Sequence, residues 1–285
     1  MSFLVRGYAG LGSLPLPSGR RVSSPGPDAP ERFQGMLRAL LHALRPRGPE
    51  GLLVGSAWGP LSEVGKRAER VLRGRPVKDW TPALVAGPAY ACAEEVGLQG
   101  PVHTVQRGAT SFAAALALAS AWPKLPLCVL GTDEVTPHVV WARAAYRGLS
   151  LNLDAEGGAG LLLGPGPKPL AHGFARVVSP PNARAWLREW LAAHPTELLF
   201  APPGLPHGLT VLPQTVKTVL STKWDGEHPA SAAGATALAV ALLSGQVQPA
   251  VAGIKNRPKR IAIVAITPRG ALGVIRLVAP GVRLG

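Results

Sequence analysis

The residues best placed to do chemistry surround a short glycine turn near the middle of the chain. Arg107-Gly108-Ala109 stands between a β-prone run and a helix rich in alanine and leucine, and such a turn places one residue at a helix N-terminus. The positive end of the helix dipole would stabilise a nucleophilic anion there. The residue in that place is Ala109, which offers no nucleophile.

Two hydroxyls and two thiols are the other candidate nucleophiles of this region. Thr110 and Ser111 follow the turn directly, but a hydroxyl needs an adjacent base, so we interpret both as helix-capping or core residues. Cys92 and Cys128 are seventeen and nineteen positions from Ala109. We interpret them as small core residues in a reducing compartment, because their spacing is typical of neither a disulfide nor a metal site.

Histidines and glycine-rich stretches give no pattern of a metal or cofactor site. The glycines at 7–12 do not follow the GxGxxG spacing of a dinucleotide loop, and residues 164–169 lack the GK[ST] ending of a phosphate loop. We therefore predict no metal and no cofactor. Metal-ligand spacing is absent among His42, His103, His138, His172 and His194.

The turn must be positioned by the elements on either side of it. Residues 102–105 predict a strand, residues 111–122 a helix without charge on any face, and residues 125–130 a strand covered on both sides. The alternation of elements along the chain predicts a mostly parallel sheet covered by helices. Further strands are predicted at 3–6, 52–54, 174–178, 197–201, 260–265 and 273–278. Helices are predicted at 31–44, 61–72, 82–97 and 212–220. Two more helices are predicted, one that contains Trp186 and Leu191 and one that ends at Leu243.

Composition limits the class of protein. The chain has 285 residues, and an apolar content of 47% argues against disorder; no apolar run is long enough for a membrane span. The start, MSFLVRGYAG, lacks the pattern of a secretory signal, so we expect a cytoplasmic protein. The net charge of +14 has two open explanations: attraction to an acidic partner, or the arginine-rich composition of proteins from GC-rich thermophiles.

The run VGLQGPVHTVQRGATSFAAALALA resembles the segment around the nucleophile of β-ketoacyl synthases. In that family a glycine-proline pair leads through a strand to an active cysteine at the start of a buried helix, and the resemblance puts Ala109 in the place of the cysteine. The following Gly131-Thr132-Asp133-Glu134 resembles the loop after the family's next strand.

A second segment, residues 221–234, is similar to the family's lysine, histidine and Ala-Ala-Gly signature. By this resemblance Lys223 corresponds to the family's lysine and His228 to its second active-site histidine. The family's first active-site histidine lies just after the strand that corresponds to residues 197–201. If the strand ends are aligned, Pro203 occupies that position and the histidine is lost; if the loop is longer, His207 occupies it and the histidine is kept. We favour its loss. The family's glycine- and phenylalanine-rich loop is replaced by residues 266–270.

The resemblance implies an α/β, thiolase-like fold. Two related βαβ-type halves, residues 1–165 and a shortened 166–285, would place their buried central helices between two sheets in a five-layer αβαβα arrangement.

Two classes of function follow. The first is a catalytically silent homologue, a partner subunit similar to a chain-length factor in fatty acid or polyketide-type acyl chain synthesis. The second is an active acyltransferase or decarboxylase with a rewired site, His228 with His207 or Ser111. Ala109, Ser111, Phe112 and His228 are the candidate pocket residues. A nucleic-acid-binding module is disfavoured, because the five phenylalanines and three tyrosines are scattered.

The resemblance also implies association. In the family the strand before the nucleophile helix pairs across a two-fold axis, and residues 101–105 are the matching edge. We expect a homodimer or a heterodimer with an active ketosynthase. An acidic acyl carrier protein could dock on Lys66, Arg67, Arg70 and Arg73.

Overall fold

The strands follow the same order in the two parts of the chain. The computed structural model describes residues 2–26, 29, 31–44, 49–134, 157–179, 181, 183–202, 205, 216–221, 223 and 230–284. The first part runs β4-β3-β5-β6-β1 and the second β9-β8-β10-β11-β7. The strands are β1 (Ser2–Leu11), β3 (Gly51–Gly55), β4 (Val102–Val105), β5 (Leu127–Thr132), β6 (Gly158–Leu163), β7 (Ala171–Val178), β8 (Leu198–Ala201), β9 (Lys217–Leu220), β10 (Arg260–Ile266) and β11 (Leu272–Val278).

The pairing directions repeat as well. In each part the inner parallel strand, β3 or β8, lies between two parallel neighbours, and β6 or β11 runs antiparallel to the strands beside it. The antiparallel pairing of β1 with β7 joins the two sets into one continuous path, to which the short β2 (Arg21–Val22) adds by pairing with β1. This repeat agrees with two related halves, while the boundary after residue 165 stays a prediction.

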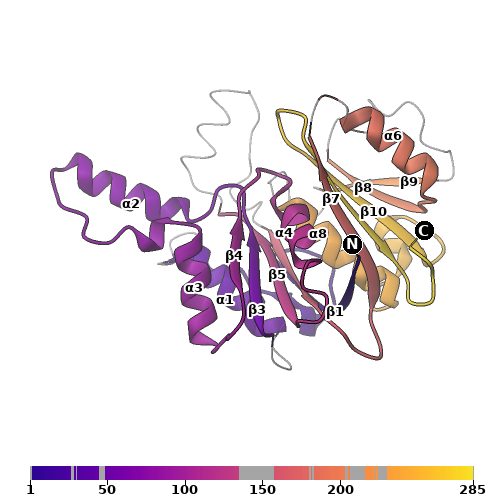
Figure 1. Cartoon of the computed structure of the whole chain (residues 1–285), viewed down its shortest axis with the longest axis horizontal. Coiled ribbons are helices and arrows are strands. Elements are labelled where there is room, and N and C mark those ends of the chain that lie inside the picture. Colours follow the sequence, from indigo (N-terminus) through magenta and orange to yellow (C-terminus); the bar gives the residue numbers. More distant parts are fainter. Residues whose placement is uncertain are drawn as a thin grey trace.

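Two buried helices lie between the two sets of strands. The helix α4 (Ser111–Ala119) contacts β3 and β5 of the first set and β7 and β11 of the second, and α8 (Ser231–Ser244) contacts β1, β6 and β10. Figure 1 shows both helices in the middle of the molecule, with strands on either side. Neither helix carries a charged residue, which permits burial on all faces. The predicted layered α/β architecture is confirmed.

The outer faces are covered by further helices. On one side α1 (Arg32–Leu44) and α3 (Ala86–Glu95) pack on each other and on the first set of strands, with Met36, Leu40 and Cys92 fully buried. On the other side α6 (Ala183–Ala193) packs Leu187 and Leu191 on the second set. The helix α2 (Leu61–Leu72) instead projects from the body (Figure 1). Short 3-10 helices are η1 (Ser18–Arg20), η2 (Thr81–Ala83) and η3 (Pro249–Ala252).

Two expectations from the sequence are wrong. The sheet is mixed rather than mostly parallel, because β6, β7 and β11 pair antiparallel with their neighbours and β1 pairs antiparallel with β6 and β7. A helix was expected at 212–220, but residues 217–220 form the edge strand β9, parallel to β8. The β-branched Thr218 and Val219 suit a pleated edge, and the unpaired side of β8 offers the hydrogen bonds. Both cysteines are buried and free, as predicted.

In the part of the chain that the structure describes, no helix is both long enough and apolar enough to cross a membrane.

Candidate functional site

The turn that precedes α4 is built as the sequence predicts. Gly108 adopts the left-handed conformation, with φ of 57°, which a side chain would strain. Ala109 is half-buried, and its methyl group packs against the main core cluster. Thr110 is the N-cap residue, and Ser111 is the first residue of α4. The position at the positive end of a buried helix therefore exists, and it holds a methyl group.

The two neighbouring hydroxyls hold the turn together. Ser111 Oγ accepts a hydrogen bond of 2.7 Å from the Arg107 N–H. It can donate to the carbonyl of Gly108 at 2.6 Å or of Ser56 at 3.1 Å. Thr110 Oγ1 donates to the carbonyl of Arg107 at 2.8 Å. Both hydroxyls thus bind backbone groups of the turn; Thr110 occupies the N-cap position, but no side-chain hydrogen bond caps α4.

Small residues allow several elements to meet at the turn. A Cβ atom added to Gly131, in β5, would lie 2.5 Å from Phe112 Cδ2 and 2.6 Å from Ala233 Cβ. The start of α4, strand β5 and the first turn of α8 therefore converge at van der Waals distance. The ring of Phe112 is 2% exposed and belongs to the core that these elements share.

The loop between β10 and β11 also reaches the turn. A Cβ atom on Gly108 would lie 3.4 Å from Thr267 Cγ2. The loop is tight: the Thr267 N–H donates to the Ala271 carbonyl at 2.9 Å, and Thr267 Oγ1 accepts from the Ala271 N–H at 3.0 Å. The loop between β10 and β11 thus lies beside the turn.

A buried carboxylate anchors the loop after β3. Asp133 directly follows β5, and its Oδ1 accepts hydrogen bonds from Ser56 Oγ at 2.6 Å, the Ala57 N–H at 2.7 Å and the Trp58 N–H at 2.8 Å. Ser56 Oγ in turn accepts from the Gly59 N–H at 2.8 Å. Burial raises the pKa of Asp133 to about 6, against the lowering effect of these hydrogen bonds.

The adjacent Glu134 binds the start of α2. Its Oε2 accepts a hydrogen bond of 3.0 Å from the Ser62 N–H, where the positive end of the helix favours a carboxylate. Its Oε1 and Ser62 Oγ are buried and make no hydrogen bond in the structure as described. Through Ser111, Ser56 and Asp133, backbone and side-chain hydrogen bonds connect the turn before α4 with the base of α2.

The roles of Asp133 and Glu134 were missed at the level of sequence, where they counted only as part of a loop. An acidic pair directly after a buried strand, at the edge where the turn also lies, was the available signal. Ser56 gives no such signal, because it lies 77 positions from Asp133.

The remaining predicted site residues are placed only in part. Lys223 is exposed, and its Nζ donates to the Val251 carbonyl at 3.4 Å, so it contacts η3. Pro203, His207 and His228 lie outside the described residues. Among the described residues, no three histidine, cysteine or acidic side chains are grouped as metal ligands would be.

Comparisons with known proteins bear on the fold. No protein-family model and no curated protein matches the chain. A solved ketosynthase/chain length factor, that of ishigamide, is similar over 99% of this chain and 100% of its own, with a TM-score of 0.73 and 17% identity. A type II polyketide ketosynthase, bound to the hexaketide and in complex with its acyl-carrier protein, is similar over 87% of this chain and 81% of its own, with a TM-score of 0.63 and 15% identity.

An oxazolomycin ketosynthase domain from Streptomyces albus is also similar, over 89% of this chain and 60% of its own, with a TM-score of 0.61 and 17% identity. At such identities the likeness establishes the fold. The protein has the thiolase-like fold of the ketosynthases, and the resemblance first noted around Ala109 is confirmed at that level.

Proposed function

We propose that this protein is a catalytically silent β-ketoacyl synthase homologue that acts as a partner subunit, similar to a chain-length factor, in fatty acid or polyketide-type acyl chain synthesis. The observation that carries the proposal is Ala109 at the turn before α4. Acyl transfer through a covalent intermediate needs a nucleophile at that helix N-terminus, and a methyl group cannot form a thioester.

The groups around Ala109 support this reading. Ser111 is buried, and its hydroxyl is bonded to backbone carbonyls and to a backbone N–H; within the described part of the chain no base is bonded to it. A nucleophilic serine needs a base that accepts its proton, and these backbone partners do not supply one. The thiols of Cys92 and Cys128 are also unsuited, since burial raises the pKa of each to about 12.

The partner is the second part of the proposal. Strand β4 is short and forms one end of the sheet, and among the described residues no strand pairs with its outer side, so pairing with the same strand of another subunit would extend the sheet. We propose a dimer, with itself or with an active ketosynthase. One similar structure is named as a ketosynthase/chain length factor, and another holds an acyl-carrier protein with its ketosynthase. An acyl carrier protein is accordingly a further proposed partner.

A condensation assay tests the silent role. Purified protein is given an acyl-carrier thioester and a malonyl-carrier donor, with an active ketosynthase in parallel as the positive control. We expect no condensation product and no release of carbon dioxide above the rate without protein. Turnover that His228→Ala abolishes would contradict the proposal and favour the rewired acyltransferase or decarboxylase.

A further inference from the structure

A buried arginine in β11 has no acidic partner. Arg276 is 3% exposed, and every other residue of the strand is apolar or glycine. Its Nη1 donates to the Leu284 carbonyl, whereas its Nε makes no hydrogen bond in the part of the chain that the structure describes. None of the ion pairs among these residues includes Arg276. A guanidinium stays protonated in proteins, so this burial cannot be relieved by loss of a proton.

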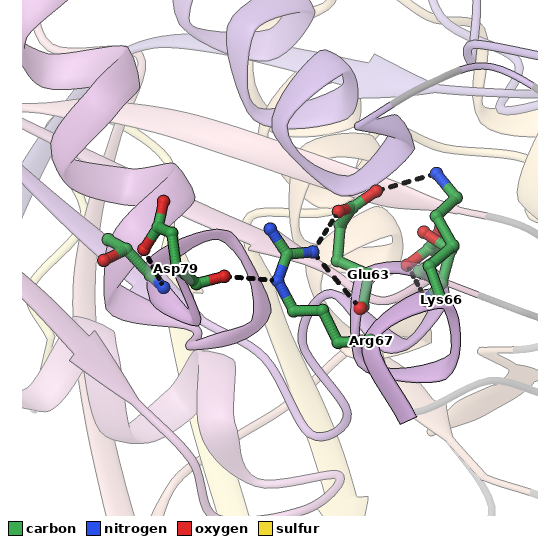
Figure 2. Close-up of polar contacts among 7 residues, drawn as sticks. Glu63, Lys66, Arg67 and Asp79 are labelled. Atoms are coloured by element: carbon green, nitrogen blue, oxygen red, sulfur yellow. Dashed lines mark hydrogen bonds and ion pairs between the residues drawn. The ribbon is translucent and has the colours of Figure 1, made fainter. Parts of the chain in front are cut away.

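Another shielded arginine shows what Arg276 lacks. The side chain of Arg67, on α2, is 14% exposed and binds the carboxylate of Glu63. Its Nε donates to the Asp79 carbonyl at 2.8 Å. Figure 2 shows Glu63 between Lys66 and Arg67. Arg67 therefore has a negative charge beside it and an acceptor for its Nε, and Arg276 has neither among the described residues.

A second arginine stands on the same face of the sheet. In the antiparallel pairing of β10 with β11, Arg276 lies opposite Ala262 and Arg260 lies opposite Val278. Arg260 is thus a diagonal neighbour of Arg276, about 7 to 8 Å away. Ala262 belongs to the core cluster beneath α6, so this is the outer face of the second set of strands. Burial, together with the positive charge of Arg260, lowers the pKa of Arg276. An anion between the two arginines would remove their repulsion.

The surrounding strands supply no such anion. Strands β7, β10 and β11 contain no aspartate and no glutamate. Glu197, directly before β8, lies nearby, but its carboxylate accepts a backbone N–H at 2.9 Å and lies 3.5 Å from Arg260. On the β7 side His172 lies opposite Val278, and its ring adds a further possible N–H donor to this face. The face thus gathers donors around Arg276.

The orientation of the guanidinium indicates the kind of anion. Nε and Nη2 donate in parallel, and this edge holds a carboxylate or a phosphate by two hydrogen bonds. The contact with Leu284 uses the other terminal nitrogen, Nη1, and Nε makes no hydrogen bond within the described chain. A macromolecular surface is too large to reach a side chain that is 3% exposed. A small oxyanion fits the chemistry and needs only the partly exposed segment at Leu284 to give way.

We propose that Arg276 and Arg260 form a binding site for a small oxyanion, a phosphate or a carboxylate group, beneath residues 279–284. The edge of Arg276 that carries Nε would hold two oxygens of the anion, and Arg260 would supply a second positive charge. The site lies on the outer face, beside the cluster that α6 covers, whereas the turn at Ala109 lies between the two sets of strands. The proposal is therefore independent of the silent role.

Thermal unfolding in inorganic phosphate tests the site, with sodium chloride at the same ionic strength as the reference. A ligand that binds only the native state raises the melting temperature as its concentration increases. We expect this rise in wild type and its loss in Arg276→Met. The control Arg188→Met removes an exposed arginine of α6 and should respond like wild type. Acetate in place of phosphate distinguishes a carboxylate ligand from a phosphate ligand: a rise with either anion supports the site, and no rise with either overturns it.

Titration calorimetry of Arg276→Lys keeps the test valid if the methionine variant does not fold. Lysine retains the positive charge but cannot offer two parallel donors, so we expect the dissociation constant for phosphate to rise at least about tenfold. Arg260→Met, which keeps the buried guanidinium, should also weaken the binding.

Nuclear magnetic resonance reports on the binding edge itself. The arginine Nε–H signal that is missing from the spectrum of Arg276→Lys belongs to Arg276, and in wild type it should shift saturably as phosphate is added. An Nε–H signal that does not shift, or equal phosphate binding by wild type and Arg276→Lys, would overturn the site. Neither result would affect the proposed silent role, which depends on the turn at Ala109.

Discussion

Asp133 Oδ1 lies 2.6 Å from Ser56 Oγ, and this contact joins the carboxyl ends of two neighbouring strands beneath the turn that holds Ala109. Ser56 Oγ also accepts a hydrogen bond from the Gly59 N–H, and the Ser56 carbonyl lies 3.1 Å from Ser111 Oγ. The backbone around the alanine is therefore held by a buried polar network. The turn at Ala109 thus has an ordered frame, which is compatible with the proposed partner role.

The first prediction concerns the pH dependence of stability. Burial raises the pKa of Asp133 from 3.8 to about 6, so the native state binds this proton more tightly than the unfolded state. The resulting stabilisation is complete below the unfolded pKa and is lost as the pH rises through the folded pKa. Asp133→Asn keeps an acceptor at Oδ1 and cannot titrate. The free energy of unfolding of wild type, relative to this variant, should fall by about 2 to 3 kcal/mol from pH 4 to pH 7.

Denaturant unfolding of both proteins at several pH values measures this difference. Parallel pH profiles for wild type and Asp133→Asn would contradict a raised pKa at this carboxyl.

The second prediction concerns Ser56. Ser56→Ala removes the donor to Asp133 and the acceptor of the Gly59 N–H in a fully buried place. We expect a loss of about 1 to 3 kcal/mol in the free energy of unfolding at pH 7, because a buried carboxylate loses one of its partners. Ser18→Ala, at an exposed position, is the matched control and should change stability by less than about 0.5 kcal/mol. Equal effects from the two variants would rule out a special role for Ser56.

The third prediction concerns the close packing at Gly131. In Gly131→Ala the new methyl group would press on Phe112 and Ala233, both of which belong to the core. We expect destabilisation by about 1 to 3 kcal/mol from overpacking. Gly19→Ala is the control, since no heavy atom lies within 4 Å of its added Cβ. A lowered melting temperature in the first variant alone is the expected result; an unchanged one would mean that α4, β5 and α8 are less tightly joined than described.

Much of this arrangement could be predicted from local sequence. The strand at Val102–Val105, the helix Leu61–Leu72 and the start of α4 at Ser111 all occur where the apolar pattern, Gly108 and the absence of charge place them. Local pattern could not supply strand direction, because β6 and β11 are buried on both faces, apart from the partly exposed Leu162, just as parallel strands covered by helices are. It also failed at β9, whose state depends on the open side of β8.

The candidate site divides in the same way. Ala109 could be found because a strand, a glycine turn and an apolar helix are contiguous in the chain. The network of Ser56 and Asp133 could not, since it depends on segments that meet only when β3 and β5 pair.

The fourth prediction restores a thiol at the turn. Ala109→Cys would stand at the positive end of α4, which lowers a thiol pKa, whereas Leu118→Cys would stand near the negative end of the same helix. Near pH 7 the cysteine at 109 should react faster with iodoacetamide, although position 118 is the more exposed of the two: Leu118 is 37% exposed, whereas Ala109 is half-buried. The buried native cysteines, whose pKa burial raises to about 12, should contribute little background. A thiol at 109 no more reactive than one at 118 would contradict the assignment of the nucleophile position.

The most direct test of the silent role is intact mass spectrometry of the wild-type protein after incubation with an acyl-carrier thioester. With alanine at the turn and no other activated nucleophile among the described residues, we predict an unchanged mass, while an active ketosynthase treated alongside gains one acyl group. A stoichiometric acyl adduct on Ser111, Cys92 or any other residue of this chain would contradict the account.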